Sequence, residues 1–199
     1  MKFILTLLLC LVLFNLQAQL SVSEIEEKRT EHLKELLDTS AHVLNHDEIT
    51  HFQGLDYFEV DTTYQIEAQF IKKKGKVFQM PSSTDKYKLM YRRIGYVQFD
   101  MHGKTNRLEV YQNMRLKKEK EYKDYLFLPF RDGTSRKESY GGGRFLDLKK
   151  PKGKTIHIDF NLAYNPYCAY SHRYTCPIPP PENELTIEIK AGEKTPIGH

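Results

Sequence analysis

The chain has 199 residues, a length that predicts one folded domain once any leader is removed. Hydrophobic residues make up 40% and charged residues 28%, a balance that favours a soluble globular protein over a disordered chain. The formal net charge of +4 is too small to indicate a nucleic-acid partner, and we expect none.

The first 19 residues have the layout of a secretory signal peptide. Lys2 supplies the positive start, residues 3–14 form an almost unbroken apolar run, and a polar exit follows. Cleavage is expected after Ala18 or Gln19, which leaves residues 20–199 as a single β-rich domain. The apolar run is too short to cross a hydrocarbon core of about 30 Å at about 1.5 Å per residue, so no transmembrane segment is expected in the mature chain. The pattern predicts a secreted or periplasmic protein.

One helix is predicted near the start of the mature chain, over residues 23–38. Ser21 or Ser23 can cap it, and acidic residues follow in its first turn, where the helix dipole favours negative charge. Apolar residues then recur at helical spacing through Leu37. Residues 44–58 are interpreted as a loop that enters the first strand.

From Tyr64 onward the sequence alternates between apolar and polar residues, as is typical of β-strands. Turns rich in glycine, lysine and proline separate most of these segments. The expected strands are residues 64–70, 77–80, 87–92, 94–101, 108–113, 125–130, 145–148, 155–160 and 185–190. Short strands with tight connections predict a mainly β fold, either an antiparallel sandwich or an open barrel, with one N-terminal helix.

Glycine, proline, cysteine, asparagine and tyrosine are concentrated in residues 130–183, so this segment is the expected location of a functional site. Three consecutive glycines at 141–143 permit close approach by a ligand, and Arg131 and Arg144 offer planar charged groups suited to an anion. The alternative is a tight bend in which Arg144 pairs with an aspartate.

The strand over residues 155–160 supplies further polar candidates. Its alternation predicts a buried face of Ile156, Ile158 and Phe160 and an opposite face that carries His157 and Asp159. Asp159 is interpreted as a base or an arginine partner, whereas a lone histidine on an exposed strand is usually just solvated. The candidate ligand-binding residues are Arg131, Gly141, Gly142, Gly143, Arg144, Asp159, Asn161 and Asn165.

The mature chain keeps two cysteines, Cys168 and Cys176. In an oxidising compartment the first expectation is a disulfide, which stabilises a small loop by about 2–3 kcal/mol. A second possibility is that Cys168 is a reactive thiolate with His172 as its base. A third is a metal site formed by these three residues, which the flanking prolines disfavour because the spacing requires a helix. We expect neither a metal nor a cofactor.

Four motifs in this region resemble those of a known family. They are Tyr-Gly-Gly-Gly-Arg (140–144), Asp-Phe-Asn (159–161), Ala-Tyr-Asn-Pro-Tyr-Cys (163–168) and Cys-Pro-Ile-Pro-Pro-Pro-Glu-Asn (176–183). The chain resembles the bacterial family named domain of unknown function 1684, most strongly from Phe127 to Glu193. This family has no established activity or cofactor, so the resemblance implies membership without assigning a role to any residue.

The preferred functional hypothesis is an extracytoplasmic protein that binds a small anionic or polar ligand in a tyrosine-rimmed pocket built from residues 130–183. One alternative is a hydrolase-type enzyme that uses Asp159 or Cys168 on a substrate derived from the cell envelope. Another alternative is a structural envelope protein without a ligand.

Overall fold

The computed structural model describes residues 19–198, so the predicted signal peptide lies outside the described residues apart from Gln19. The first element is helix α1 (Val22–Leu37), which confirms the predicted helix to within one residue at each end. Its N-terminus is a capping box: the Ser21 hydroxyl accepts a hydrogen bond from the Glu24 amide, and the Glu24 carboxylate accepts one from the Ser21 amide.

A second helix, α2 (His46–His51), occupies part of the segment that was expected to be a loop. Asn45 caps it, and Glu48 completes another capping box at the same spacing. The Asn-x-x-Glu signal was therefore present in the sequence, but the helix is too short to show an apolar stripe.

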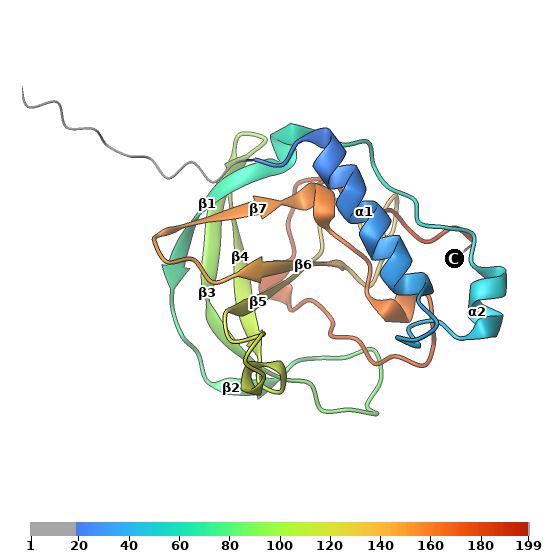
Figure 1. Cartoon of the computed structure of the whole chain (residues 1–199). Helices are drawn as coiled ribbons and strands as arrows, with labels where there is room; N and C mark the ends of the chain where they lie inside the picture. Colours follow the sequence, from blue (N-terminus) through green and yellow to red (C-terminus); the bar gives the residue numbers. More distant parts are fainter. Residues whose placement is uncertain (1–18, 199) are drawn as a thin grey trace, which may run out of the picture.

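Seven strands in the described chain form one antiparallel sheet that curls into a half-barrel (Figure 1). The strands are β1 (Gln65–Lys72), β2 (Val77–Gln79), β3 (Met90–Met101), β4 (Lys104–Asn113), β5 (Tyr125–Phe130), β6 (Arg144–Lys149) and β7 (Thr155–Asp159). Their order is β6-β5-β4-β3-β1-β7, with β2 paired to β3. The prediction of a mainly antiparallel β fold is confirmed in its open-barrel form.

Two strand predictions differ from the structure. Residues 90–92 of one predicted segment and the whole of 94–101 belong to one continuous strand, β3, which has a bulge between Arg93 and Gly95, whereas residues 87–89 lie outside it. Residues 185–190 form no regular strand, because their backbone groups bond irregularly: the Leu185 amide donates to the Arg131 carbonyl and the Ile189 amide donates to the Asp132 carboxylate. Their alternate side chains are nevertheless buried. The prediction that these side chains are buried is therefore correct, whereas the prediction of a strand is wrong.

The side chains of β5 and β6 are divided between two hydrophobic clusters. Leu126, Leu128 and Leu146 belong to the main core inside the half-barrel. Phe127 and Phe145 alternate with them along the strands and belong to a second, aromatic cluster on the other face of the sheet. Strand alternation thus creates an aromatic face beside the main core.

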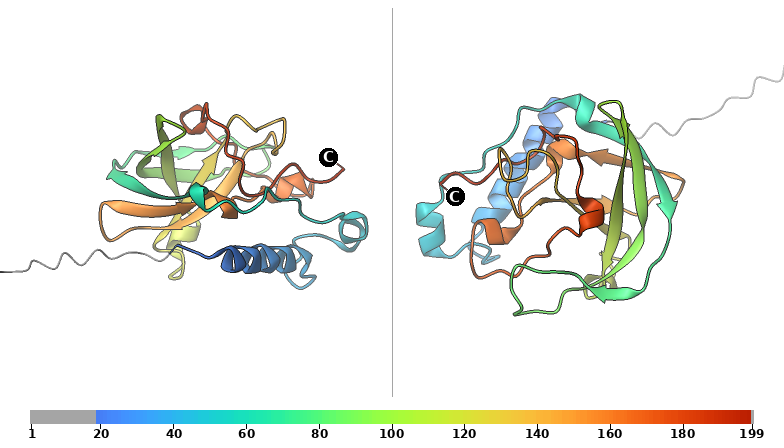
Figure 2. Two further views of the ribbon diagram at one scale, coloured as in Figure 1. Left: turned by 90° about the horizontal axis from the view of Figure 1, so that it is seen from above. Right: turned by 180° about the vertical axis from the view of Figure 1, so that it is seen from behind.

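Helix α1 lies on the side of the molecule opposite β3 and β4 (Figures 1 and 2). Arg29 attaches it to the domain: this buried side chain donates two hydrogen bonds to the Asn161 carbonyl, at 3.3 and 3.2 Å, and its guanidinium lies 4.4 Å from the centre of the Tyr57 ring. Within the described residues, no helix is both long and apolar enough to span a membrane.

Asn183 joins β4 to β5, which share a single paired position, Tyr111 with Phe127. Its side chain is fully buried and takes the place of backbone hydrogen bonds that β4 and β5 do not form with each other. Nδ2 donates to the carbonyls of Glu109 (2.9 Å) and Pro129 (2.6 Å), and Oδ1 accepts from the Glu109 amide at 2.8 Å. One amide group therefore satisfies three backbone groups that no strand reaches.

Asn183→Ala is expected to lower the free energy of unfolding by about 2–4 kcal/mol, because it leaves buried backbone groups unsatisfied. Urea denaturation followed by circular dichroism measures this loss. The matched control is Glu182→Ala on the same turn, an exposed position where we expect a change of about 0.5 kcal/mol or less. A similar small change in both variants would contradict the bridging role of Asn183.

Candidate functional site

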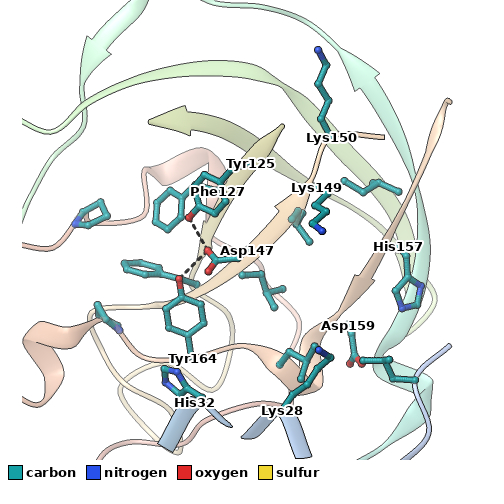
Figure 3. Close-up of a pocket in the computed structure, with 18 of the residues that line it drawn as sticks. Lys28, His32, Tyr125, Phe127, Asp147, Lys149, Lys150, His157, Asp159 and Tyr164 are labelled. Atoms are coloured by element: carbon teal, nitrogen blue, oxygen red, sulfur yellow. Dashed lines mark hydrogen bonds between the residues drawn. The ribbon is translucent and has the colours of Figure 1, made fainter. Parts of the chain in front are cut away.

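A cleft of about 1480 Å³ lies between α1 and the two edge strands of the sheet, β6 and β7 (Figure 3). Among the described strands no ladder joins β6 to β7, so the half-barrel is open along this line. The loop that connects these two strands contributes further lining residues. Side chains on both strand edges are consequently accessible from the cleft.

Asp147 lies in this cleft among aromatic side chains. On β6 it shares a face with Phe145, and in the ladder it stands directly opposite Phe127 of β5. Two tyrosines hold its carboxylate: the hydroxyls of Tyr125 and Tyr164 donate to the same oxygen, Oδ1, at 2.7 and 2.9 Å. Four rings from three chain segments therefore surround one carboxylate (Figure 3).

The electrostatic environment of Asp147 is unusual for a carboxylate that solvent can reach. Removal of bulk water by the surrounding protein raises the pKa of Asp147, and the hydrogen bonds from Tyr125 and Tyr164 only partly oppose this rise. Burial also raises the pKa of both tyrosines, which keeps their hydroxyls protonated as donors at neutral pH. No basic side chain of the described residues forms an ion pair with Asp147 within 4.0 Å.

His32 of α1 connects the cleft to a buried carboxylate, Glu193. Its Nε2 lies 3.2 Å from Oε1 of Glu193, which is fully buried. Glu193 also accepts hydrogen bonds from the hydroxyls of Tyr57 (3.1 Å) and Tyr170 (2.7 Å) and from the Asn165 amide (2.8 Å). Burial of the imidazole disfavours its charged form, but the contact with Glu193 outweighs this effect and raises the pKa of His32.

The other end of the cleft is polar. Lys28 lies there with His157 and Asp159 of β7, and Lys149 of β6 lines the cleft opposite Tyr125 (Figure 3). The buried Asp159 accepts hydrogen bonds from Gln65 Nε2 at 3.0 Å and from the Asn161 amide at 2.9 Å. Its two oxygens are therefore both engaged by the protein.

Of the eight ligand-binding residues predicted from the sequence, only Asp159 lines the cleft. The predicted burial of Ile156 and Ile158 is confirmed, since both belong to the main core; His157 and Asp159 line the cleft, as does Ile156. His157 was set aside as a solvated histidine, yet it belongs to the same wall.

Arg144 and Arg131 do not converge on one hollow. Arg144 pairs with Phe130 in the ladder, so it points into the core, where it contacts Asp132 at 3.2 Å and the Ile189 carbonyl at 2.9 Å. It is fully buried and has no exposed atoms for a ligand. Arg131, the next residue after Phe130, takes the opposite face and donates from Nε to the Gly141 carbonyl at 3.2 Å. This arrangement corresponds to the structural alternative for Arg144.

The glycines and asparagines predicted to bind a ligand also have structural roles. Gly143 has a φ of 92°, and a Cβ atom there would lie 2.8 Å from the Phe130 carbonyl oxygen, so the bend requires glycine. Asn161 and Asn165 are fully buried. Asn161 exchanges hydrogen bonds with the Asp61 backbone at 3.0 and 2.9 Å, so it holds a loop.

The predicted disulfide is not found: Cys168 and Cys176 are free cysteines. They lie close together, since the Cys168 amide donates to the Cys176 sulfur at 3.2 Å. A hydrogen bond from the Cys176 thiol, with smaller contributions from Ser83 and Tyr140, lowers the pKa of Cys168 to about 7. The described residues contain no group of three or more His, Cys, Asp or Glu side chains that could hold a metal ion.

A family model described as "Protein of unknown function (DUF1684)" matches residues 50–194. The solution NMR structure of the uncharacterized protein from gene locus rrnAC0354 of Haloarcula marismortui is 31% identical to this chain, and its fold agrees with a TM-score of 0.67. That comparison covers 89% of this chain and 95% of the other. No curated protein matches the sequence. The family indicated by the sequence motifs is thus the one that matches.

Arg144→Ala is expected to lower the free energy of unfolding by about 3–5 kcal/mol, because Asp132 remains buried without its cation. Chemical denaturation of the purified protein tests this. The control is Arg131→Ala, whose partly exposed side chain loses a single hydrogen bond, with an expected cost of about 1 kcal/mol. Small and equal losses would instead indicate that Arg144 is available to a ligand.

Asp147→Asn is expected to melt no lower than the wild type at pH 7. Because the folded state raises the pKa of Asp147, its contribution to stability is present below the unfolded pKa of about 3.9 and is lost as pH rises through the folded pKa. The difference in melting temperature between the Asn variant and the wild type should therefore become smaller as the pH falls from 7 to 4. Thermal melts across this range measure it, and a large loss of stability at pH 7 would make Asp147 a structural residue.

Proposed function

The chain belongs to the DUF1684 family, and we propose that it is a binding protein for a small polar ligand that enters the cleft between α1, β6 and β7. The observation that supports this function best is Asp147. Its Oδ1 accepts two tyrosine hydroxyls, whereas no described residue donates a hydrogen bond to Oδ2. The ligand anchors on this second oxygen.

A structural role does not account for Asp147. The buried carboxylates Asp132 and Asp159 are paired with a cation or saturated by donors, whereas Asp147 is exposed to the cleft and its Oδ2 has no donor among the described residues. The hydrogen-bond donors of Asp147 are neutral, and burial by the surrounding protein raises its pKa, so the fold disfavours its charged form relative to a carboxyl group in water. Perturbed carboxylates in a large cleft are characteristic of functional sites.

The size of the cleft favours a ligand that fills only part of it. Small-molecule sites usually measure about 300–1,000 Å³, which is less than the whole cleft. Asp147 and its four aromatic neighbours provide the combination of apolar walls and one precise polar group that such sites use. We therefore place the ligand against Asp147 and leave the polar end to solvent or to the far end of the ligand.

The two other hypotheses have less support. An enzyme based on Asp159 would use a carboxylate whose oxygens are already engaged, and Cys168 is not among the residues that line the cleft. A purely structural role fits Arg144 and Asn161, but it leaves Asp147 unexplained. The signal-peptide pattern of residues 1–19 supports the further proposal that binding takes place outside the cytoplasm.

Screening by saturation-transfer NMR tests the binding function. A library of small polar compounds of mixed charge should give hits with the wild type that lose most of their signal in Asp147→Asn. The control variant is Asp85→Asn, an exposed aspartate outside the cleft that carries the same change in charge. A library without hits, or hits that persist unchanged in Asp147→Asn, would contradict the proposal.

A further inference from the structure

We infer that the ligand of the cleft carries an ammonium group that binds against Asp147. This inference depends on the proposed binding function and names the chemical class of the ligand. It concerns the aromatic end of the cleft, which is defined by Asp147 together with Phe127, Phe145, Tyr125 and Tyr164.

A row of aromatic rings runs along this end of the cleft. The ring of Phe127 lies 4.8 Å from that of Phe145, which lies 6.0 Å from that of Tyr164. Tyr91 extends the row on the far side of Phe127, at 5.4 Å. All four rings line the cleft. The rings of Tyr91, Phe127 and Phe145 are largely buried, and that of Tyr164 is partly exposed. Because the faces of aromatic rings are electron-rich, the exposed part of this wall attracts a cation and does not attract an anion.

The carboxylate adds a charge that the protein does not match. The two tyrosine hydroxyls on Oδ1 satisfy hydrogen bonds but bring no positive charge. A neutral ligand would leave the charge of Asp147, which is exposed to the cleft, without a cationic partner, and an anionic ligand would be repelled by it. An ammonium group compensates the charge and contacts the rings at the same time.

The other charges near the aromatic end leave this preference intact. His32, the nearest candidate cation on α1, is already in contact with the buried carboxylate of Glu193. His32 adds positive potential at Asp147, and Glu35, which lines the same cleft, opposes it with negative potential. Lys28 lies toward the side of His157 and Asp159 (Figure 3), whereas Lys149 shares the face of Asp147 on β6 and stands opposite Tyr125 in the ladder. Among the described residues, none of these cationic side chains forms an ion pair with Asp147 within 4.0 Å.

Matched pairs of cation and neutral analogue test the inference. Choline and 3,3-dimethylbutan-1-ol have the same shape but differ in charge, and butylamine and butan-1-ol form a second pair. In NMR titrations of the full mature chain, each ammonium compound should bind at least about tenfold more tightly than its alcohol, a ratio that equals about 1.4 kcal/mol. Asp147→Asn should remove most of this difference.

Two further variants keep the test valid if Asp147→Asn perturbs the fold. Phe127→Leu keeps an apolar side chain but removes one ring, and it should weaken choline several-fold while it leaves the alcohol almost unchanged. Asp85→Asn should bind both compounds like the wild type. Melting curves without ligand show whether each variant is folded.

The outcomes separate this inference from the proposed function. If the alcohols bind as tightly as the ammonium compounds, or if neither cation binds, the ammonium inference is overturned. Library hits that require Asp147 but carry no cationic group would retain the binding function and reject this inference. An absence of any hit in the library and in these titrations would reject both.

Discussion

The open line between β6 and β7 is the constraint on which the rest of the site depends. These strands are consecutive in the chain, and a hairpin between them would have closed the barrel. Instead β7 pairs with β1, and β6 is bridged at Phe145 by the backbone of Tyr164. That bridge covers part of one exposed edge, while charged residues of the connecting loop discourage pairing with another chain. The cleft exists because the sheet ends here.

Buried polar groups hold the irregular C-terminal segment against this incomplete sheet. Asn183 supplies hydrogen bonds that β4 and β5 lack, and Arg144 donates to the carbonyls of Ile189, Ala191 and Glu193. A segment without a ladder must satisfy its backbone through side chains, since each unsatisfied buried group is costly. The asparagines and the arginine that stand out in the sequence serve this requirement.

The sequence predicted which side chains are buried better than it predicted which residues they contact. Alternation located the strands and assigned the faces of β7, because the side-chain period depends only on local geometry. The same alternation correctly predicted that the side chains of Leu185 and Ile187 are buried, but it could not show that the backbone of this segment forms hydrogen bonds with loop residues. Asp147 was missed for a related reason. Alternation places it beside Phe145, yet the contribution of Tyr164 depends on a contact between segments that no local pattern reveals.

Strand β6 shows why the unusual charge, rather than the unusual motif, identifies the site. Arg144 and Asp147 lie three residues apart and therefore on opposite faces of the strand. The face of Arg144 is the core, where a charge persists only if it is fully compensated, and Asp132 with the backbone carbonyls provides that compensation. The face of Asp147 opens on the cleft, where two neutral hydroxyls donate hydrogen bonds to it and no cation of the described residues forms an ion pair with it. A fold that compensates one charge so thoroughly and leaves the other without a cationic partner ties the first to stability and supports the proposal that the second serves recognition.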